Sequence, residues 1–415
     1  MGETEMLDLL QPEIPAGDDW LSKEEVAALT PAIIKQRLID LKPMIAANAR
    51  EAERLRRPVT EVIAAIRKTG YFYLMVPRAF GGMGATPLDL IETTTPIAEA
   101  CMSTAWVSAF IVNHNWLASH LPEQAQQETW GGSSPYLFAP AVSNPPGVGR
   151  RVEGGYRISG RWKWGTCVMH ADWVIGFSQL ETDGDPAYGM ALFPVQDVKI
   201  IDTWHSDGLR GTGSHDILVE DLFVPTHRTA FLGPVFLGQS GAAERFSSPI
   251  YGMPMLPFLT FAASVPAIGG ARAAIAAIAK RLTVHTRVGD FVAQVEKPIS
   301  QARLARADLM ARTGEMLIRQ VAQEMVGYHD VPETDRLATR LRWRAQIAEG
   351  VHHCREAVRI ASASAGSSLH FLDNPLQRIM RDIDVQSTHF VFDLDAAHEQ
   401  YGRSLVGLEP NAAFS

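Results

Sequence analysis

Cysteine is scarce in this sequence, and so is any concentration of positive charge. The 415 residues contain three cysteines, no Cys-x-x-Cys pair and no run of lysine or arginine, and the net charge is −8. A disulfide framework or a cysteine zinc site therefore has no basis, and we expect no metal. A nucleic-acid-binding protein needs a basic face to offset phosphate charge, so we expect no nucleic-acid partner. Isolated, reduced thiols favour a cytoplasmic protein.

The sequence also lacks a clear secretion or membrane signal. Its first twenty residues are acidic and have no long apolar core, which disfavours a signal peptide. One uncharged stretch, 246–271, is long enough to span a bilayer, but it contains four prolines. Prolines would leave backbone groups unpaired in lipid. We interpret this stretch as a buried, irregular approach to a helix, and we expect no membrane partner.

Three motifs of common cofactor and metal sites are missing as well. The sequence has no Gly-x-Gly-x-x-Gly after an expected strand, no P-loop and no His-Glu-x-x-His. A Rossmann dinucleotide site and a zinc protease site are therefore unsupported. What the chain does have is a globular composition, with 46% hydrophobic and 20% charged residues, which can bury a sizeable core. A small-molecule partner fits this composition best.

The order of secondary-structure signals predicts an α+β fold in three parts. Apolar residues recur at three- and four-residue steps from 31 to 67, another helix should begin at Pro87, and a third should cover 104–120. Short β-rich runs with turns between them then predict a small antiparallel barrel or sandwich. We expect the following domains: an N-terminal helical domain at 1–130, a central β-barrel at 131–235 and a C-terminal four-helix bundle at 236–415.

Four long periodic segments with short breaks support the predicted bundle. These segments are 268–283, 299–328, 334–364 and 375–401.

Two segments of the β region carry the side chains most suited to chemistry. In 160–173, Trp162 and Trp164 alternate along a strand and should share one face. With the hydroxyl of Thr166 nearby, they could form a wall for a flat ring with polar edges, or simply barrel core and a turn. In 204–214, glycines, hydroxyls and Arg210 could cradle a phosphate with backbone amides, or form a polar hairpin loop.

In context these segments resemble the acyl-CoA dehydrogenase superfamily, over about residues 30 to 405. The resemblance implies the same order of helical domain, β-barrel and four-helix bundle. Gly160, Trp164 and Thr166 are similar to the family's flavin-wall strand, whose threonine touches flavin N5. The other matching positions are Gly208 to Thr212 (Gly-x-Arg-Gly-Thr), Arg287 (an arginine that reaches the flavin phosphates of a neighbouring subunit), and Asn374, Pro375, Arg378, Arg381 and Asp382 (the penultimate-helix signature).

The chain departs from true acyl-CoA dehydrogenases at the catalytic base. Those enzymes need a carboxylate to take the α-proton of an acyl thioester. One family position for it falls near Phe390, next to His389, and the other lies on the first bundle helix, where no Asp or Glu occurs between Glu244 and Asp290. If 375–401 is one helix, His389 is turned by about 100° from Phe390. A dehydrogenase whose base is Asp384 or Asp393 stays an alternative.

The remaining features are similar to the oxygenase component of two-component flavin-dependent monooxygenases (group D aromatic hydroxylases). The similarity lies in 114–116, in 166–173, in 204–214 and in His389 after Arg381-Asp382. That subgroup usually carries Ser-Gly where this chain has Thr166-Cys167. The resemblance implies reduced FMN or FAD and O2 as cofactors, and hydroxylation of an aromatic or heteroaromatic small molecule through a C4a-hydroperoxyflavin. A non-catalytic flavin-binding protein of the same fold is a further alternative.

The resemblance also implies roles for individual residues. Thr166 should hydrogen-bond near N5 and protect the oxygen adduct, His389 should assist its formation and protonation, and His114 should polarise or deprotonate the substrate. His120 and His170 are expected to be structural, His170 through a backbone bond. The remaining assignments are Trp164, Arg210, Thr212, Ser214 and Arg287 at the cofactor, and Trp116 and Phe390 with His114 in the substrate pocket.

The resemblance further implies that this chain does not work alone. It contains no separate NAD(P)H site, so electrons should come from a separate NAD(P)H-dependent flavin reductase. An arginine that acts on a neighbouring subunit's flavin implies a homotetramer, or at least a dimer.

Overall fold

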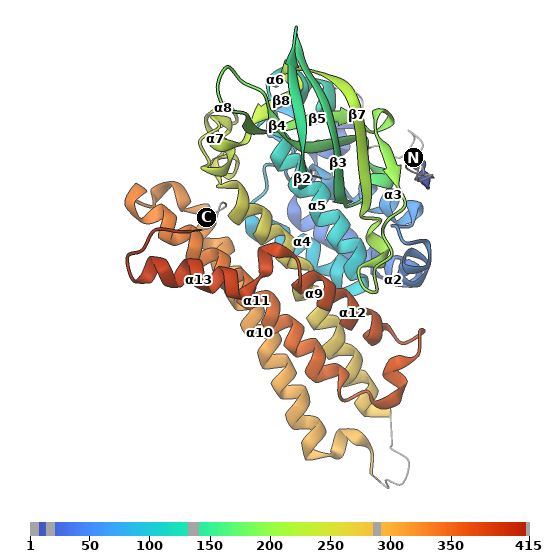
Figure 1. Ribbon diagram of the computed structural model, residues 1–415. Helices are drawn as coiled ribbons and strands as arrows, with labels where there is room; N and C mark the ends of the chain where they lie inside the picture. Colours follow the sequence, from blue (N-terminus) through green and yellow to red (C-terminus); the bar gives the residue numbers. More distant parts are fainter. Residues whose placement is uncertain (1–7, 14–20, 132–140, 285–291, 412–415) are drawn as a thin grey trace, which may run out of the picture.

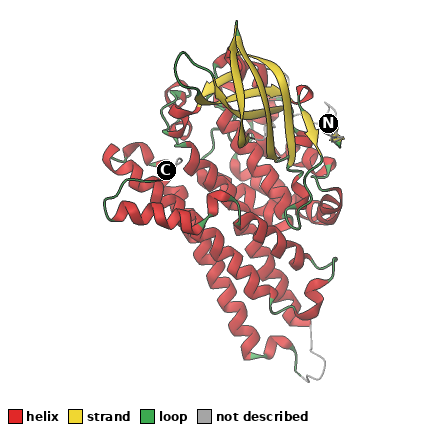
Figure 2. Ribbon diagram, in the orientation of Figure 1, coloured by secondary structure: helices red, strands yellow, loops and turns green. Residues whose placement is uncertain are grey.

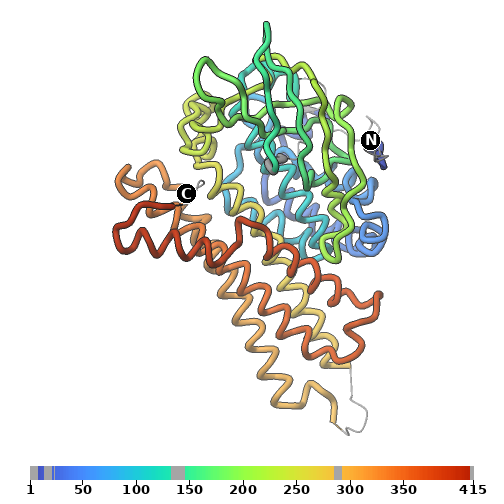
Figure 3. Tube along the Cα trace, in the orientation of Figure 1, coloured from blue at the N-terminus to red at the C-terminus, as the bar shows by residue number. Residues whose placement is uncertain are grey.

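The computed structural model describes residues 8–13, 21–131, 141–284 and 292–411, without the side chains of Lys23 and 141–144. A curled sheet lies above a layer of N-terminal helices, and long C-terminal helices extend away below them (Figures 1 and 2). The first described segment (blue) and the last described helix (red) lie on opposite sides of the molecule (Figure 3). The site described below forms where these layers meet.

The N-terminal region is helical up to residue 130. Its helices are α1 (Lys23–Ala27), α2 (Pro31–Leu55), α3 (Thr60–Thr69), α4 (Pro87–Ala100), α5 (Met102–Ala118) and α6 (Glu123–Trp130). The predicted run 31–67 is two helices, because Arg56 takes the left-handed conformation at φ 56° and ends α2. The predicted start at Pro87 is confirmed, where Thr86 and Asp89 cap each other's backbone amides. Helix α5 is buried along nearly its whole length.

The central sheet has eight strands in the order β1-β6-β7-β3-β2-β4-β5-β8. These are β1 (Leu9–Leu10), β2 (Ala141–Val152), β3 (Gly155–Gly165), β4 (Trp173–Leu180), β5 (Ala187–Pro194), β6 (Lys199–Ile201), β7 (His215–Pro225) and β8 (Thr229–Phe231). Strands β2 and β4 pair in parallel and the other pairs are antiparallel.

The small antiparallel barrel or sandwich expected from the sequence is therefore not confirmed. Among the described residues the edge strands β1 and β8 do not pair, so the sheet is mixed, curled and open. Strand β1 comes from the N-terminal region, which the predicted division at residue 130 assigns to helices alone. It pairs with β6 through Leu9 and Leu10, so this N-terminal segment forms an edge strand of the sheet.

The C-terminal region holds seven helices in the described part of the chain. They are α7 (Leu232–Phe236), α8 (Ala242–Arg245), α9 (Met255–Val284), α10 (Pro298–Val326), α11 (Glu333–Ser362), α12 (Pro375–Ser387) and α13 (Leu394–Leu405). The predicted fourth bundle helix is wrong, because 375–401 is divided between α12 and α13. His389 leaves the helical conformation at φ −62°, ψ 137°, and Phe390–Phe392 form a single 3-10 turn.

Helix α9 contains most of the uncharged stretch 246–271 and lies in the protein core. By length and composition alone it could cross a membrane, but 72% of its most apolar window is buried inside the protein. It packs against α4, α5 and α11, and it accommodates Pro266 within the helix. The helix therefore begins earlier, at Met255, than the sequence suggested.

Candidate functional site

A strained turn at the end of β3 presents Trp164 and Thr166. Trp164 and Cys167 both take left-handed conformations, at φ 65° and 64°, which are costly for residues with side chains and cluster at functional sites. The amide of Thr166 donates to the carbonyl of Trp164 at 2.8 Å. The turn leaves the Trp164 side chain 55% exposed, while Trp162 is fully buried. The expectation that both indoles share one face is wrong, because the register slips between Trp162 and Gly165.

Trp162 instead fills the inside of the sheet. Its indole nitrogen donates to the carbonyl of Phe177 at 2.8 Å. A Cβ on Gly147 would lie 2.4 Å from the indole, and one on Gly160 would lie 2.8 Å from it. These glycines are therefore needed for the close approach of the ring to the strands. Trp162 is a core residue, and Trp164 alone offers an indole surface to a ligand.

A row of three buried hydroxyls joins the two segments selected from the sequence. The hydroxyl of Thr166 lies 3.0 Å from that of Ser214, which lies 2.8 Å from that of Thr212. The amide of Cys167 donates to the carbonyl of Thr212 at 3.1 Å, which ties the two segments through their backbones as well. We refer to Thr166, Ser214 and Thr212 as the hydroxyl row.

The Arg210–Thr212 turn beside this row has an unsatisfied donor. Leu209 before it and Gly213 after it are both left-handed, at φ 48° and 58°. Arg210 is half-buried, and its Nε atom is buried with no hydrogen-bond partner among the residues the structure describes. A buried donor without a partner points to a ligand that supplies an acceptor. The hydroxyl row, this donor and the exposed Trp164 indole together fit a flat ring with polar edges and a phosphate, as in a flavin.

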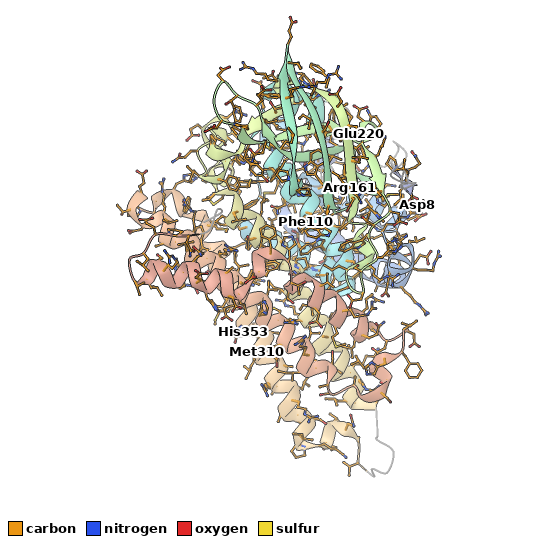
Figure 4. All side chains as sticks on the ribbon, in the orientation of Figure 1. Asp8, Phe110, Arg161, Glu220, Met310 and His353 are labelled. Atoms are coloured by element: carbon orange, nitrogen blue, oxygen red, sulfur yellow. The ribbon has the colours of Figure 1, made fainter. Side chains whose placement is uncertain are left out.

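A second row runs along one face of α5 and combines aromatic rings with two histidines. Trp106, Phe110 and His114 are four residues apart, so they follow one helix face. The ring centroids of Trp106 and Phe110 lie 4.5 Å apart, and those of Phe110 and His114 lie 5.6 Å apart. The ring of His389 meets Trp106 edge-on at 5.6 Å. We call His389, Trp106, Phe110 and His114 the aromatic row; Phe110 lies between the sheet and the C-terminal helices (Figure 4).

Sequence reasoning selected the two histidines of this row but missed Trp106 and Phe110. The signal was present, because both lie at four-residue steps before His114 on an expected helix. Their contact with His389 could not be anticipated, since His389 was placed on a helix. The extended backbone at His389 is what turns its ring toward Trp106.

Burial keeps both histidines of the aromatic row neutral. It lowers the pKa of His114 to about 3 and the pKa of His389 to about 4. Removing an imidazolium from water costs free energy, so the neutral form is favoured near pH 7. Each ring can then accept a hydrogen bond at one nitrogen and donate at the other.

The two rows meet at α5. The Arg210–Thr212 turn packs against α5, and a Cβ on Gly211 would lie 3.2 Å from the Cβ of Ser103. Ser103 precedes Trp106 by one turn of α5. A ring lying along the hydroxyl row would therefore be next to the start of the aromatic row.

Other predicted site residues lie elsewhere. Trp116 has no exposed surface and donates its indole N–H to the carbonyl of Ile250 at 2.7 Å, so its ring packs in the core. Phe390 is 56% exposed, and its ring centroid lies 4.9 Å from that of His389 with the rings tilted by 35°. Arg287 lies outside the described residues.

The two structural histidines are held by side chains. The backbone amide of His170 donates to the carbonyl of Cys167 at 2.9 Å, which is the expected backbone bond. Its ring is buried, and the ring Nε2 lies 3.1 Å from the hydroxyl of Thr60. The Nδ1 of His120 lies 2.6 Å from the hydroxyl of Ser240. Burial lowers the pKa of each of these histidines to about 3.

The two carboxylates that could have served as a dehydrogenase base are both engaged elsewhere. Asp384 forms ion pairs with Arg355 at 2.6 Å and Arg359 at 3.1 Å. Asp393 caps the start of α13 by accepting from the amide of Ala396 at 2.9 Å. Neither of these two carboxylates is therefore free to remove an α-proton.

Comparisons with known proteins agree with this geometry. The Acyl-CoA dehydrogenase N-terminal domain family matches residues 41–131, and the Acyl-CoA dehydrogenase C-terminal domain family matches residues 261–394. The oxygenase subunit HsaA of a flavin-dependent monooxygenase from Rhodococcus jostii is 32% identical, over 90% of this chain and 98% of its own. The oxygenase component of the FADH(2)-dependent resorcinol hydroxylase from Rhizobium is 30% identical, over 91% and 95%.

Solved structures are similar in fold as well as in sequence. XiaF from Streptomyces, in complex with FADH2 and glycerol, superposes with a TM-score of 0.86 at 27% identity, over 94% of this chain and 98% of that one. The fold is therefore that of the acyl-CoA dehydrogenases. Within that fold, the chain belongs to the family of flavin-dependent monooxygenase oxygenase components.

Proposed function

We propose that this chain is the oxygenase component of a two-component system that hydroxylates a small aromatic or heteroaromatic molecule, with reduced FMN or FAD and O2. The observation that carries the proposal is the meeting of the hydroxyl row and the aromatic row at α5. When bound, reduced flavin supplies the two electrons and two protons that convert an aromatic C–H and O2 into a C–OH and water.

The hydroxyl row and its neighbours would hold the cofactor. Thr166 would hydrogen-bond at the N5 edge of the flavin ring, and Trp164 would cover one face of the ring. Arg210, with Thr212 and Ser214, would contact its polar edge or phosphates through the unsatisfied donor at Nε. Arg287 would reach the phosphates of a flavin in a neighbouring subunit. A homotetramer would complete each site in this way.

The aromatic row would hold the substrate. Neutral His114 accepts a hydrogen bond from a phenol O–H or an N–H, and so orients and polarises that group. Trp106 and Phe110 give flat apolar surfaces that pack against an aromatic ring. His389 lies at the end of the row nearest the hydroxyl row, where its neutral ring can donate a hydrogen bond to reduced oxygen.

The same proposal includes a partner and a location. Relatives described as oxygenase subunits or components support a separate NAD(P)H-dependent flavin reductase as the source of electrons. The three free, buried cysteines are consistent with a cytoplasmic protein. The reductase could supply flavin by diffusion, because the hydroxyl row and Arg210 would provide contacts for free cofactor.

The direct test supplies reduced FAD or FMN from a purified flavin reductase with NADH and air. Resorcinol, phenol and indole serve as substrate probes, and product is quantified by liquid chromatography. We expect a hydroxylated product from at least one aromatic probe, in amounts that depend on both flavin and oxygen. Formation of enoyl-CoA from acyl-CoA thioesters, without aromatic product, would overturn the proposal in favour of a dehydrogenase.

A further inference from the structure

A single buried carboxylate joins three parts of the molecule. Asp382, on α12, is 2% exposed. One of its oxygens accepts a hydrogen bond from the amide of Leu209 at 2.7 Å, and the other accepts one from the hydroxyl of Ser103 at 3.3 Å. Leu209 belongs to the segment that leads into the hydroxyl row, and Ser103 belongs to α5. Asp382 therefore lies outside both rows but is bonded to the elements that carry them.

The segment before the hydroxyl row sits directly on α12. A Cβ on Gly208 would lie 2.1 Å from the carbonyl oxygen of Arg381, so the backbones are in close contact. The guanidinium of Arg381 donates to the carbonyl of Asp207 and also pairs with Glu53 at 2.5 Å. Leu209, which is left-handed, follows, and its amide donates the hydrogen bond to Asp382 described above. The position of Arg210 and the hydroxyls after it is thus set from α12.

The aromatic row is tied to the same carboxylate from the other side. Helix α12 ends at Ser387, and His389 follows two residues later. Ser103 is one turn before Trp106, whose ring contacts that of His389 at 5.6 Å. Asp382 is therefore connected to all three parts of the site. It bonds to Leu209 before the hydroxyl row and to Ser103 on α5, and it lies on α12, which leads to His389.

We propose that Asp382 is a positioning residue that fixes the hydroxyl row relative to His389 and Trp106. The inference rests on the proposed function, because displacement of the hydroxyl row relative to His389 would appear as poorer protection of reduced flavin from oxygen. Misplacement of reacting groups by about 1 Å can reduce rates by roughly a hundredfold. The expected loss with Asp382 is smaller, about tenfold, because Arg381 still anchors Asp207.

The test compares Asp382→Ala with Asp382→Asn. Alanine removes both hydrogen bonds, whereas asparagine can accept from Leu209 through its oxygen and donate to Ser103 through its amide. Asp384→Asn is the matched control, because Asp384 lies on the same helix but pairs with Arg355 on α11. Two quantities are measured: deuterium exchange of peptides covering 205–214 in the protein alone, and the rate of peroxide release from the protein mixed with reduced FAD and oxygen.

We expect Asp382→Ala to exchange faster over 205–214 and to release peroxide about tenfold faster, while Asp382→Asn and Asp384→Asn stay close to the unmodified protein. Peroxide release equal to wild type in folded Asp382→Ala would overturn the inference, and so would Asp382→Asn behaving like alanine. If Asp382→Ala does not fold, the variant Ser103→Ala tests the proposal instead. It should release peroxide faster than the unmodified protein without a change in deuterium exchange over 205–214, and an unchanged rate of peroxide release would contradict the proposal.

The outcome also separates this inference from the proposed function. If the unmodified protein fails to slow peroxide release from reduced FAD compared with free FAD, the proposed function fails, whatever the variants do. If it slows release and Asp382→Ala slows it equally, the proposed function stands and the positioning role of Asp382 fails.

Discussion

The hydroxyl oxygen of Thr166 lies 3.0 Å from that of Ser214, a residue 48 positions further along the chain. Because Ser214 also pairs with Thr212 at 2.8 Å, three hydroxyls form one row. Three hydroxyls carry three protons, and two hydrogen bonds within the row use only two of them. One O–H therefore remains to donate to a bound molecule, and the row can reverse its direction when the molecule instead donates.

Replacing Thr166 with alanine should uncouple oxygen use from hydroxylation. The loss of one hydrogen bond to a reactive centre costs about 1–3 kcal/mol, which corresponds to roughly ten- to hundredfold faster loss of activated oxygen as peroxide. Oxygen uptake should continue while product falls and peroxide rises, as measured with an oxygen electrode and a peroxide assay. Thr166→Ser, which keeps the hydroxyl, is the control and should stay coupled. Equal coupling in the alanine variant would remove Thr166 from the site.

His389→Ala should slow product formation without unfolding the protein. The ring is half-buried and touches Trp106 and Phe390, and the loss of a hydrogen bond to a reacting oxygen costs about 1–3 kcal/mol. We expect at least a tenfold lower rate with a similar melting temperature. The exposed His398, which pairs with Glu349 at 3.0 Å, gives the control His398→Ala. Wild-type kinetics in His389→Ala would leave His389 with a packing role only.

Position 167 should prefer glycine to alanine. Cys167 is buried with φ 64°, a conformation that glycine adopts without penalty and other residues adopt at a cost of about 1–2 kcal/mol. Cys167→Gly should therefore have a free energy of unfolding about 1 kcal/mol above that of Cys167→Ala. At Cys354, inside α11, the order should reverse, because glycine destabilises helix interiors by about 1 kcal/mol relative to alanine. Urea unfolding of the four variants measures which of glycine and alanine is more stable at each site. The same ranking at both sites would contradict the left-handed conformation of Cys167.

His114 should contribute to the loss of stability in acid. Its folded pKa of about 3 lies below the unfolded value of about 6.5, so the unfolded chain binds more protons between these pH values. The free energy of unfolding should therefore fall as pH drops from 7 to 5, by about 2 kcal/mol from this residue alone. Urea unfolding at both pH values should show a smaller fall for His114→Gln. An equal fall in that variant would mean that His114 is protonated in the folded protein.

Much of the site could be read from the sequence because its chemistry is local. Thr166, Thr212 and Ser214 lie in two short segments whose glycines and hydroxyls stand out, and His114 lies on a helix with a clear period. What the sequence could not supply were relationships that depend on a break in regular structure. The left-handed Trp164 turns its indole away from Trp162, and the extended His389 ends α12. Neither residue type carries a local signal for those conformations.

The open sheet was missed for a similar reason. Short strands with turns between them fit a closed barrel equally well, and β1 has only the two residues Leu9 and Leu10. Its pairing with β6 depends on contacts far apart in the chain. The aromatic contact between Trp106 and His389 is likewise long-range. The sequence shows the four-residue spacing of Trp106, Phe110 and His114, but it does not show that His389 joins them.

The central claim is that oxygen from O2 enters an aromatic ring within this site. The most direct measurement supplies ¹⁸O2 and reductase-generated reduced FAD to the protein with resorcinol, phenol or indole, and determines the mass of the product. We expect a product that carries one ¹⁸O atom per added hydroxyl group, and loss of that product in Thr166→Ala with a matching gain in peroxide. A product oxygen derived from water, or complete conversion of O2 to peroxide by the unmodified protein with every aromatic probe, would contradict it.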